Sequence, residues 1–441
     1  MGHMATHPLT DVKRQMAACI QCAACMPACP TYRTAHKESM GPRGRLALAI
    51  GLLEGDIAPE QGAVVPITSC IDCRACVPAC PRHIPLDAVF YAAKAELSSR
   101  GAGGIQSTVL RWAARLIVVP NRFSRMLPWL RAGVTFYRGI ADSSPAARLL
   151  PFFRRGKKRV LPPVVTRPMT DDYPERVTPA QPRGRVAFFP GCVINFTQTG
   201  IGHATIRVLE KLDIEVVIPR EAPCCGIPLL SLGDREGARQ VARDVVARYS
   251  ELEVDAVITA CASCGTTLRD TYPGLIGADA APLADKVMDV AEYITAHTNY
   301  QTRAAHLDIR VTYHDPCHLV RGMGVTEAPR QILKTVAGDG FTEMRDADRC
   351  CGFGGLFSAL HYDMALEVGA AKAKAVADSG AERVATGCPG CQMQLTDTLA
   401  RGDVAARAAH TVELLEEAID QNDVAAGKHP TPQPTRTNKT Y

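Results

Sequence analysis

Two cysteine runs near the start of the chain constrain its fold more than any other feature. Each has the pattern C-x-x-C-x-x-C-x-x-x-C-P, first from Cys19 to Pro30 and again from Cys70 to Pro81. At this spacing three cysteines of a run hold three corners of a 4Fe-4S cubane, and the fourth reaches across to the other cluster. The expected metal ligands form two sets: Cys19, Cys22, Cys25 and Cys80, and Cys70, Cys73, Cys76 and Cys29. Paired C-x-x-C motifs also bind zinc, but the doubled full pattern favours two 4Fe-4S clusters.

The chemical role of the 18 cysteines in this 441-residue chain depends on whether the protein resides in a reducing or an oxidising cell compartment. The first fifteen residues are polar and lack the apolar region of a secretory signal. The longest apolar stretches are shorter than the roughly 20 residues of a membrane-spanning helix. We therefore expect a cytoplasmic location, with peripheral contact on the cytoplasmic face of the inner membrane as a further expectation. In a reducing compartment, cysteines serve metal binding or redox chemistry rather than structural disulfides.

The ten remaining cysteines form an internal repeat. Each half contains a single cysteine, then Cys-Cys-Gly, then Cys-x-x-Cys. The first set is Cys192, Cys224, Cys225, Cys261 and Cys264, and the second is Cys317, Cys350, Cys351, Cys388 and Cys391. Matching positions are 125 to 127 residues apart, which indicates one duplicated unit.

Short β-forming runs precede the cysteines of each half, and helical segments lie between them. The expected strands are 186–189, 214–218, 256–259, 309–313, 341–344 and 383–385, and the expected helices are 204–212, 238–249, 328–336, 365–377 and 412–419. Alternating strands and helices predict parallel sheets, in which ligands gather beyond the carboxyl ends of the strands. Three strand ends of one half can therefore converge on one cofactor.

The predicted fold class is a multidomain α+β and α/β protein, with a helical two-cluster domain followed by two duplicated α/β domains. The predicted boundaries are 1–105 for the two-cluster domain, 106–183 for a basic, aromatic and proline-rich connector, 184–300 and 301–421 for the two halves, and 422–441 for a disordered tail.

The connector has an unusual charge. Between Arg111 and Arg159 there are twelve Lys or Arg residues and one acid, Asp142, interleaved with aromatic side chains. Eight prolines between Pro145 and Pro182 exclude a continuous helix or a central strand and indicate a linker. No nucleic-acid-binding module is recognisable, so we expect no nucleic-acid partner. A partner-docking surface and an anionic membrane surface, the latter favoured by a polybasic patch at 154–159, both fit.

Several short motifs carry a resemblance to known proteins. They are Gly41-Pro-Arg-Gly-Arg45, Phe189-Pro-Gly-Cys192, Pro223-Cys-Cys-Gly226, His314-Asp-Pro-Cys-His318 and Cys350-Cys-Gly-Phe-Gly-Gly355. With them, nearly the whole chain resembles the iron–sulfur subunits of glycolate oxidase and lactate-oxidising complexes. It is also similar to the anaerobic glycerol-3-phosphate dehydrogenase subunit and to heterodisulfide reductases. In heterodisulfide reductases, a complete five-cysteine set implies a non-cubane 4Fe-4S cluster. We expect a further 4Fe-4S cluster in each half, while a dithiol or zinc stays open as an alternative.

Two pairs of residues near these motifs allow more than one interpretation. His314 and His318 could tune a cluster, move a proton or cap a strand. Arg43 and Arg45 could donate hydrogen bonds to cluster sulfurs or start a solvated helix.

The expected function follows from what the chain does not encode. We find no G-x-G-x-x-G dinucleotide motif and assign no catalytic residue. The resemblance implies an oxidoreductase component: the electron-transfer subunit of a flavin-dependent glycolate or lactate dehydrogenase complex. It would relay electrons from an FAD-containing subunit to a quinone. Alternatives are the glycerol-3-phosphate dehydrogenase subunit and a heterodisulfide-reductase-like catalytic subunit.

Overall fold

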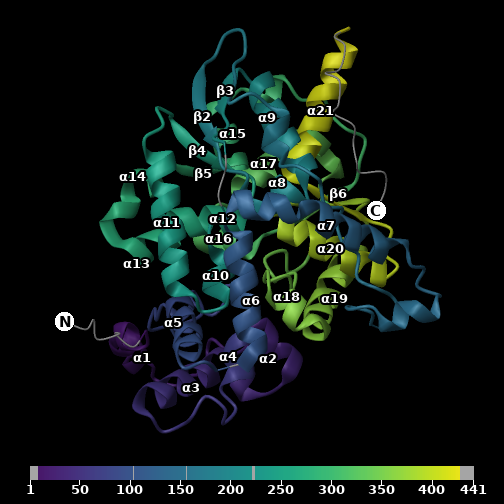
Figure 1. Ribbon diagram of the computed structural model, residues 1–441. Helices are drawn as coiled ribbons and strands as arrows, with labels where there is room; N and C mark the ends of the chain where they lie inside the picture. The colour runs from purple at the N-terminus through teal and green to yellow at the C-terminus, as the bar shows by residue number, and fades with distance from the viewer. Residues whose placement is uncertain (1–7, 103, 155, 221–223, 428–441) are drawn as a thin grey trace.

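Helices surround both cysteine runs at the base of the molecule (Figure 1). The computed structural model describes residues 8–102, 104–154, 156–220 and 224–427. The basal helices are α1 (Lys13–Ala17), α2 (Pro30–Ala35), α3 (Pro42–Glu54), α4 (Val64–Thr68) and α5 (Leu86–Ser99). Pro30 starts α2, where its missing N–H costs no hydrogen bond. Helix α3 ends at Glu54 and is capped by Gly55, whose φ of 82° is left-handed.

Two longer helices lead from this base to the rest of the chain (Figure 1). Helix α6 (Gly104–Ile117) runs up the side of the molecule, and α7 (Pro120–Gly139) crosses beside the second half. Arg111 donates to the carbonyl oxygen of Ser98 at 3.0 Å, and Arg115 forms an ion pair with Asp234 at 2.6 Å. These contacts fix α6 to both the basal domain and the first half. No helix among the described residues combines the length and apolar character needed to cross a bilayer.

The first half is built on a five-stranded sheet in the order β1-β3-β2-β4-β5. The strands are β1 (Arg176–Val177), β2 (Gly184–Phe188), β3 (Ile214–Val217), β4 (Ala256–Thr259) and β5 (Val287–Asp289). All neighbours pair in parallel except β1 with β3. The helices of this half are α8 (Gly191–Phe196), α9 (Thr199–Lys211), α10 (Ile227–Ser231), α11 (Arg235–Ser250), α12 (Ala262–Thr266), α13 (Tyr272–Ile276), α14 (Ala281–Ala284) and α15 (Val290–His297).

The second half repeats this topology with a parallel sheet in the order β6-β7-β8. The strands are β6 (Val311–His314), β7 (Arg383–Thr386) and β8 (Arg407–His410). The helices are α16 (Cys317–Met323), α17 (Glu327–Ala337), α18 (Phe357–Leu360), α19 (Tyr362–Asp378), α20 (Pro389–Arg401) and α21 (Thr411–Ala425). This order matches β2-β4-β5 of the first half, so the predicted α/β fold and its duplication are confirmed.

One predicted strand is wrong. Residues 341–344 form a single parallel bridge, between Phe341 and Val311, at the edge where the first half has β3. The chain then leaves the sheet, and Glu343 pairs with Arg330 of α17 at 2.7 Å. Asp346, with a left-handed φ of 55°, follows in a turn.

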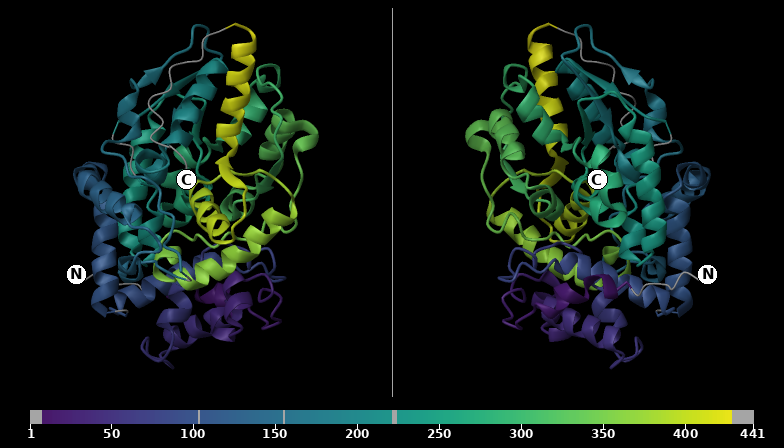
Figure 2. Two further views of the ribbon diagram at one scale, coloured as in Figure 1. Left: turned by 90° about the vertical axis from the view of Figure 1, so that its right-hand side faces the viewer. Right: turned by 90° about the vertical axis from the view of Figure 1, so that its left-hand side faces the viewer.

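One hydrophobic cluster extends across both halves, and a smaller one lies within the second half. Buried side chains of both sheets, such as Val257 and Val311, belong to the same cluster. Helix α9 packs along α21, and Lys211 binds Asp420 and Asp423 at 2.6 and 2.9 Å. Figure 2 shows both halves side by side above the basal helices. The two repeats are therefore packed into one body, and the boundary at residue 300 stays a prediction.

The proline-rich stretch is not a free linker. It supplies the edge strand β1 and a segment that packs on the second half, where the Val160 amide donates to Asp397 at 2.8 Å. In the predicted polybasic patch, Arg154 is exposed, but other basic residues contact the second half. Arg159 is buried and donates to Ser358, while Lys157 pairs with Asp403 at 2.8 Å. Arg155 lies outside the described residues, as does the predicted tail beyond residue 427, whereas residues 422–425 belong to α21.

Candidate iron–sulfur sites

The eight cysteines of the N-terminal runs gather into two hollows. Cys19, Cys22, Cys25 and Cys80 line the first hollow, and Cys29, Cys70, Cys73 and Cys76 line the second. In each hollow, three cysteines come from one run and the fourth from the other. This is the crossed arrangement expected from the spacing.

The backbone of both runs adopts the same rare conformation. Gln21 and Ala23 in the first run, and Asp72 and Arg74 in the second, have φ between 55° and 63°. These four residues occupy equivalent positions two and four residues after the first cysteine. Alternating left-handed residues turn successive N–H groups to one side, as in anion-binding nests at iron–sulfur sites. Because such φ values are costly for residues other than glycine, their repetition indicates a functional constraint.

A buried cation lies beside the second hollow. Arg45 is 1% exposed, and its Nη1 lies 3.7 Å from Cys29 Sγ. It also donates to Pro66 O at 2.6 Å and to Thr31 Oγ1 at 2.9 Å. No carboxylate among the described residues forms an ion pair with Arg45. An isolated buried charge is unfavourable, so this guanidinium fits a hollow that holds an anionic group such as a thiolate-bound cluster. Arg43, by contrast, is partly exposed and pairs with Glu38 at 2.7 Å.

A second buried cation was missed in the sequence. Lys94 of α5 binds the Asp72 carboxylate at 2.7 Å and the carbonyl oxygen of Cys70 at 3.2 Å. Both partners of the ion pair are almost fully buried. Burial also raises the pKa of Cys70 to about 12, so this sulfur ionises at neutral pH only beside a positive centre such as a metal. A lysine in the apolar pattern of residues 86–99 was the signal available in the sequence.

The second half meets the basal domain through cysteines. Cys73 of the second hollow is hydrogen-bonded to Cys350, which is also hydrogen-bonded to Cys317. Ile71, Cys73, Cys350 and Phe357 belong to one buried cluster. Beyond it, Cys351 Sγ lies 3.4 Å from Cys391 Sγ, which is longer than a disulfide bond. The second hollow and the cysteines of the second half are therefore neighbours.

The cysteines of the first half continue this series of contacts beyond the second half. Cys261 is hydrogen-bonded to Cys388 of the second half and to Cys264 of its own half. Cys264 contacts Cys225, and Cys224 Sγ lies 3.8 Å from Cys192 Sγ. All eighteen cysteines are free thiols in the structure. The ten repeated cysteines thus form a continuous buried group that begins at Cys73.

The two Cys-Cys-Gly turns have the conformation that the sequence suggests. Gly226 and Gly352 have φ of 85° and 90°, values that favour glycine. A hydrogen bond from Cys224 lowers the pKa of Cys225 far below its ordinary value, and one from Cys350 does the same for Cys351. Each turn therefore stabilises a thiolate, which is the ligand form of cysteine.

His318 joins three parts of the chain. Its Nε2 lies 2.9 Å from the carbonyl oxygen of Asp72, and its Nδ1 lies 3.0 Å from Ser263 Oγ. A carbonyl oxygen only accepts, so Nε2 carries the proton and Nδ1 accepts from the serine. His318 therefore ties the basal domain and both halves together where their cysteines meet.

Lys372 is another residue that the sequence did not single out. It lies in α19, is 1% exposed, and donates to the carbonyl oxygen of Ala347 at 3.1 Å. Burial lowers its pKa to about 8, while the nearby Cys351 and Cys350 oppose that shift. The second half, like the second hollow, thus places a buried cation beside its cysteines, as expected around an anionic cluster.

Comparison with known proteins agrees with this division of the chain. Residues 15–84 match the family described as the 4Fe-4S dicluster domain, and residues 186–269 and 311–396 match the cysteine-rich domain. The probable glycolate oxidase iron–sulfur subunit of Bacillus subtilis is 30% identical over 418 residues, which cover 92% of this chain and 94% of that protein. The chain belongs to this family of iron–sulfur subunits. The resemblance stated from the sequence motifs is therefore confirmed.

Two further relatives show the range of proteins built in this way. Lactate utilization protein A of Macrococcus caseolyticus is 31% identical, and the match covers 54% of this chain and 98% of that protein. A component of the dihydromethanophenazine:CoB–CoM heterodisulfide reductase of Methanosarcina barkeri is 26% identical, covering 94% of this chain and 97% of that protein. These relatives carry different names, so membership in the family does not by itself specify a substrate.

Proposed function

We propose that this chain is the electron-transfer subunit of a flavin-dependent glycolate or lactate dehydrogenase complex. An FAD-containing subunit would oxidise the 2-hydroxy acid, and this chain would carry the electrons to a quinone. The cysteine sites would hold 4Fe-4S centres, which accept and release single electrons. The names of the Bacillus subtilis and Macrococcus caseolyticus relatives support this choice of complex.

The observation that carries the proposal is the serial arrangement of the cysteine sites. The hollow of Cys70 and Cys73 adjoins the second half through Cys350, and the second half adjoins the first through Cys388 and Cys261. Buried contacts of this kind keep neighbouring centres close, and His318 holds all three parts in register. A protein that stored iron or used a single metal would not need four cysteine sites in one line.

The outer hollow of the basal domain is the proposed entry point. Cys22 is exposed, and its neighbour Ile20 is 62% exposed. The exposure of Cys22 allows a partner flavoprotein to bring its flavin close to this cysteine site. The other cysteine sites are mostly buried, so this hollow is the better approach for a partner's flavin.

A cavity of about 720 Å³ beside the first half is the proposed quinone site. Val165 lines it and donates through its amide to Phe196 O at 3.1 Å, at the end of the short helix that contains Cys192. His203 also lines the cavity and shares a hydrogen bond of 2.9 Å with Tyr173, which provides polar groups for a quinone oxygen. Met169 and Leu414 supply apolar contacts for its ring.

We further propose that α6 and α7 lie on an anionic membrane surface. Trp112, Trp129 and Phe136 are 65%, 82% and 70% exposed, and Trp129 and Phe136 share one face of α7. Arg122 and Arg125 are exposed beside them. Aromatic side chains with cations suit the interface of a bilayer containing anionic lipids. A double variant, W129S/F136S, should lose co-sedimentation with phosphatidylglycerol vesicles, while V424S, an exposed change on α21, should not.

Anaerobic iron and sulfide analysis of the full chain tests the main proposal. Four 4Fe-4S clusters require about 16 irons per chain, whereas two clusters with zinc in the C-terminal halves give about 8. Reduction with dithionite, followed by EPR, should show interacting paramagnetic centres. An iron content near 8 together with bound zinc would refute a relay through the two halves.

The heterodisulfide reductase relative supports a second candidate function. Its match covers nearly the whole of both chains, and the two five-cysteine sets meet at Cys261 and Cys388. A disulfide substrate would then react at the cysteine sites themselves. Reduction of a disulfide by the purified chain, with a chemical electron donor and no flavoprotein, would favour this candidate over the first.

A further inference from the structure

His314 occupies an unusual position at the end of β6. The side chain is fully buried, and among the described residues neither ring nitrogen makes a hydrogen bond of good geometry, although the backbone of Ala347 lies close to the ring. Burying an imidazole without well-formed hydrogen bonds is unfavourable. The side chain therefore does not cap the strand, and its position needs another explanation.

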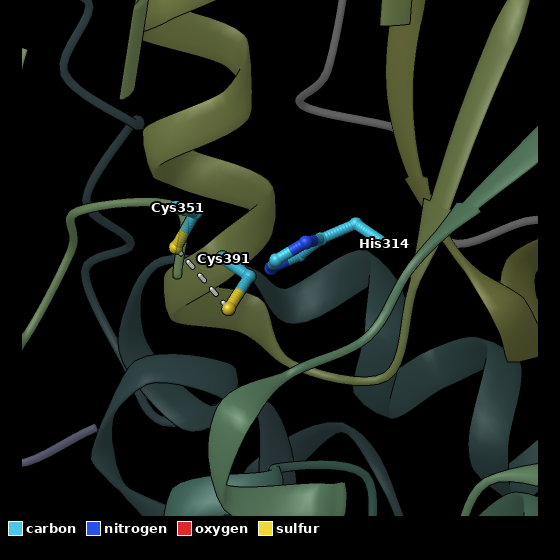
Figure 3. Close-up of side chains that lie close together, drawn as sticks. All are labelled: His314, Cys351 and Cys391. Carbon is cyan, nitrogen blue, oxygen red and sulfur yellow. Dashed lines mark hydrogen bonds between the residues drawn. The ribbon is translucent and has the colours of Figure 1, made fainter. Parts of the chain in front are cut away.

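The imidazole ring of His314 faces the sulfur atoms of two cysteines. One nitrogen of His314 and the Sγ atoms of Cys351 and Cys391 all lie within 4.8 Å of one another. Figure 3 shows the imidazole directed toward the two sulfurs, which come from the Cys-Cys-Gly turn and from α20. A neutral imidazole has a lone pair on one ring nitrogen, and that lone pair can bind a metal. Neutral imidazole nitrogen and thiolate sulfur are both ligands of iron and zinc.

The other cysteines of this half face different neighbours. Cys317 and Cys350 lie toward Cys73 of the basal domain, whereas Cys388 lies between Cys391 and Cys261 of the first half. A nitrogen donor at the end of β6 thus lies beside Cys351 and Cys391.

The equivalent position of the first half has no such donor. Three residues before Cys192 the chain has Phe189, as it has His314 three residues before Cys317. Phe189 is fully buried, and its ring packs against Tyr249 with centroids 5.4 Å apart. The two halves share their cysteines and topology but differ in this one potential ligand.

We propose that His314 is a nitrogen ligand of the metal centre that Cys351 and Cys391 hold. This inference rests on the proposed function for the identity of that centre as an iron–sulfur cluster. The second-half centre then has mixed nitrogen and sulfur ligation, and the first-half centre has sulfur ligation. His314 then takes the place of one of the five thiolates available in this half. Neutral imidazole in place of a thiolate raises the potential of an iron–sulfur centre, so the second half becomes the site that holds an electron more strongly.

Nitrogen hyperfine spectroscopy on the full, iron-loaded chain tests the proposal. The wild-type protein is prepared with ¹⁴N-histidine and with ¹⁵N-histidine and is reduced stepwise. We expect a histidine nitrogen coupling that changes with the isotope, is lost in H314F, and persists in H306Q. H314F installs the first-half residue, and His306 is a suitable control because its side chain is exposed and belongs to none of the cysteine sites.

The isotope experiment tests the proposal even when a variant does not bind its iron–sulfur clusters. If H314F does not bind iron, the isotope comparison in wild-type protein decides alone, and the absence of any histidine coupling overturns the proposal. Persistence of the coupling in an iron-loaded H314F also overturns it. An iron content near 8 per chain together with bound zinc would instead refute the proposed electron relay through the two halves. Zinc K-edge X-ray absorption then tests His314 separately, through a nitrogen neighbour at about 2.0 to 2.1 Å that H314F should remove.

Discussion

Arg45 provides the sharpest test of how the protein sets the potential of a centre. Its guanidinium is buried, lies 3.7 Å from Cys29 Sγ, and forms no ion pair with a carboxylate among the described residues. A positive charge at this position stabilises the reduced, more negative form of a centre in the second hollow. We therefore expect R45M, which removes the charge but keeps much of the side-chain volume, to lower the reduction potential of that centre.

The size of the effect follows from Coulomb's law. With the added electron about 6 Å from the guanidinium and an effective dielectric constant of about 20, the interaction is about 3 kcal/mol. For a one-electron couple, 59 mV corresponds to a tenfold change or 1.36 kcal/mol, so the expected fall is about 120 mV. Loss of the hydrogen bond to Cys29 acts in the same direction.

Potentiometric titration monitored by EPR measures this change. R45K is the matched control because it keeps the positive charge, and its potential should fall by less than half as much. Iron content is measured for each variant, so that loss of the cluster is not mistaken for a shift. An unchanged potential in iron-loaded R45M would show that Arg45 supports the fold at Pro66, Ser69 and Thr31 without tuning the centre.

Three further predictions concern stability. K94M leaves the buried Asp72 carboxylate unpaired and should lower the free energy of unfolding by about 3 to 5 kcal/mol, while the double variant K94M/D72N should recover part of this loss in chemical denaturation. G352A places a Cβ at a φ of 90° and 2.6 Å from the carbonyl oxygen of Ala365, so it should lower the free energy of unfolding by roughly 2 kcal/mol or more. The control G274A, whose Cβ meets nothing within 4 Å, should leave that free energy unchanged. Equal melting temperatures for the two variants would contradict the argument. Burial lowers the pKa of His203 to about 4, so the folded state binds fewer protons than the unfolded state between about pH 6.5 and pH 4. Stability should therefore fall by at most about 3 kcal/mol as the pH decreases through this window, and H203Q should flatten that part of the melting-temperature profile.

The sequence alone predicted those features of the fold that depend on the spacing of the cysteines along the chain. The two runs predicted the crossed sets around Cys80 and Cys29, because a fixed C-x-x-C spacing allows few arrangements around a cubane. The repeat predicted duplicated parallel sheets, because five cysteines recur after β-forming runs at nearly constant separation. These inferences use information that lies within a few residues of each motif.

The sequence was insufficient where distant segments decide the outcome. The run at 341–344 has strand-forming residues, but the chain leaves the sheet where Glu343 contacts Arg330. The basic residues near Arg159 suggest a surface patch, but Ser358 and Asp403 of the second half engage them. The partners of His318 lie 55 and 246 residues away in the chain, so no local pattern reveals them.

The presence of both repeats in one chain affects the direction in which electrons move between the two halves. Two separate but identical halves would have to place the same residue at both equivalent positions, and a pair of identical sites has no preferred end. Within a single polypeptide, Phe189 and His314 are free to differ while the sheets and cysteines around them stay alike. A repeated backbone thus carries two unequal sites, and an electron placed between them has a thermodynamic reason to favour one.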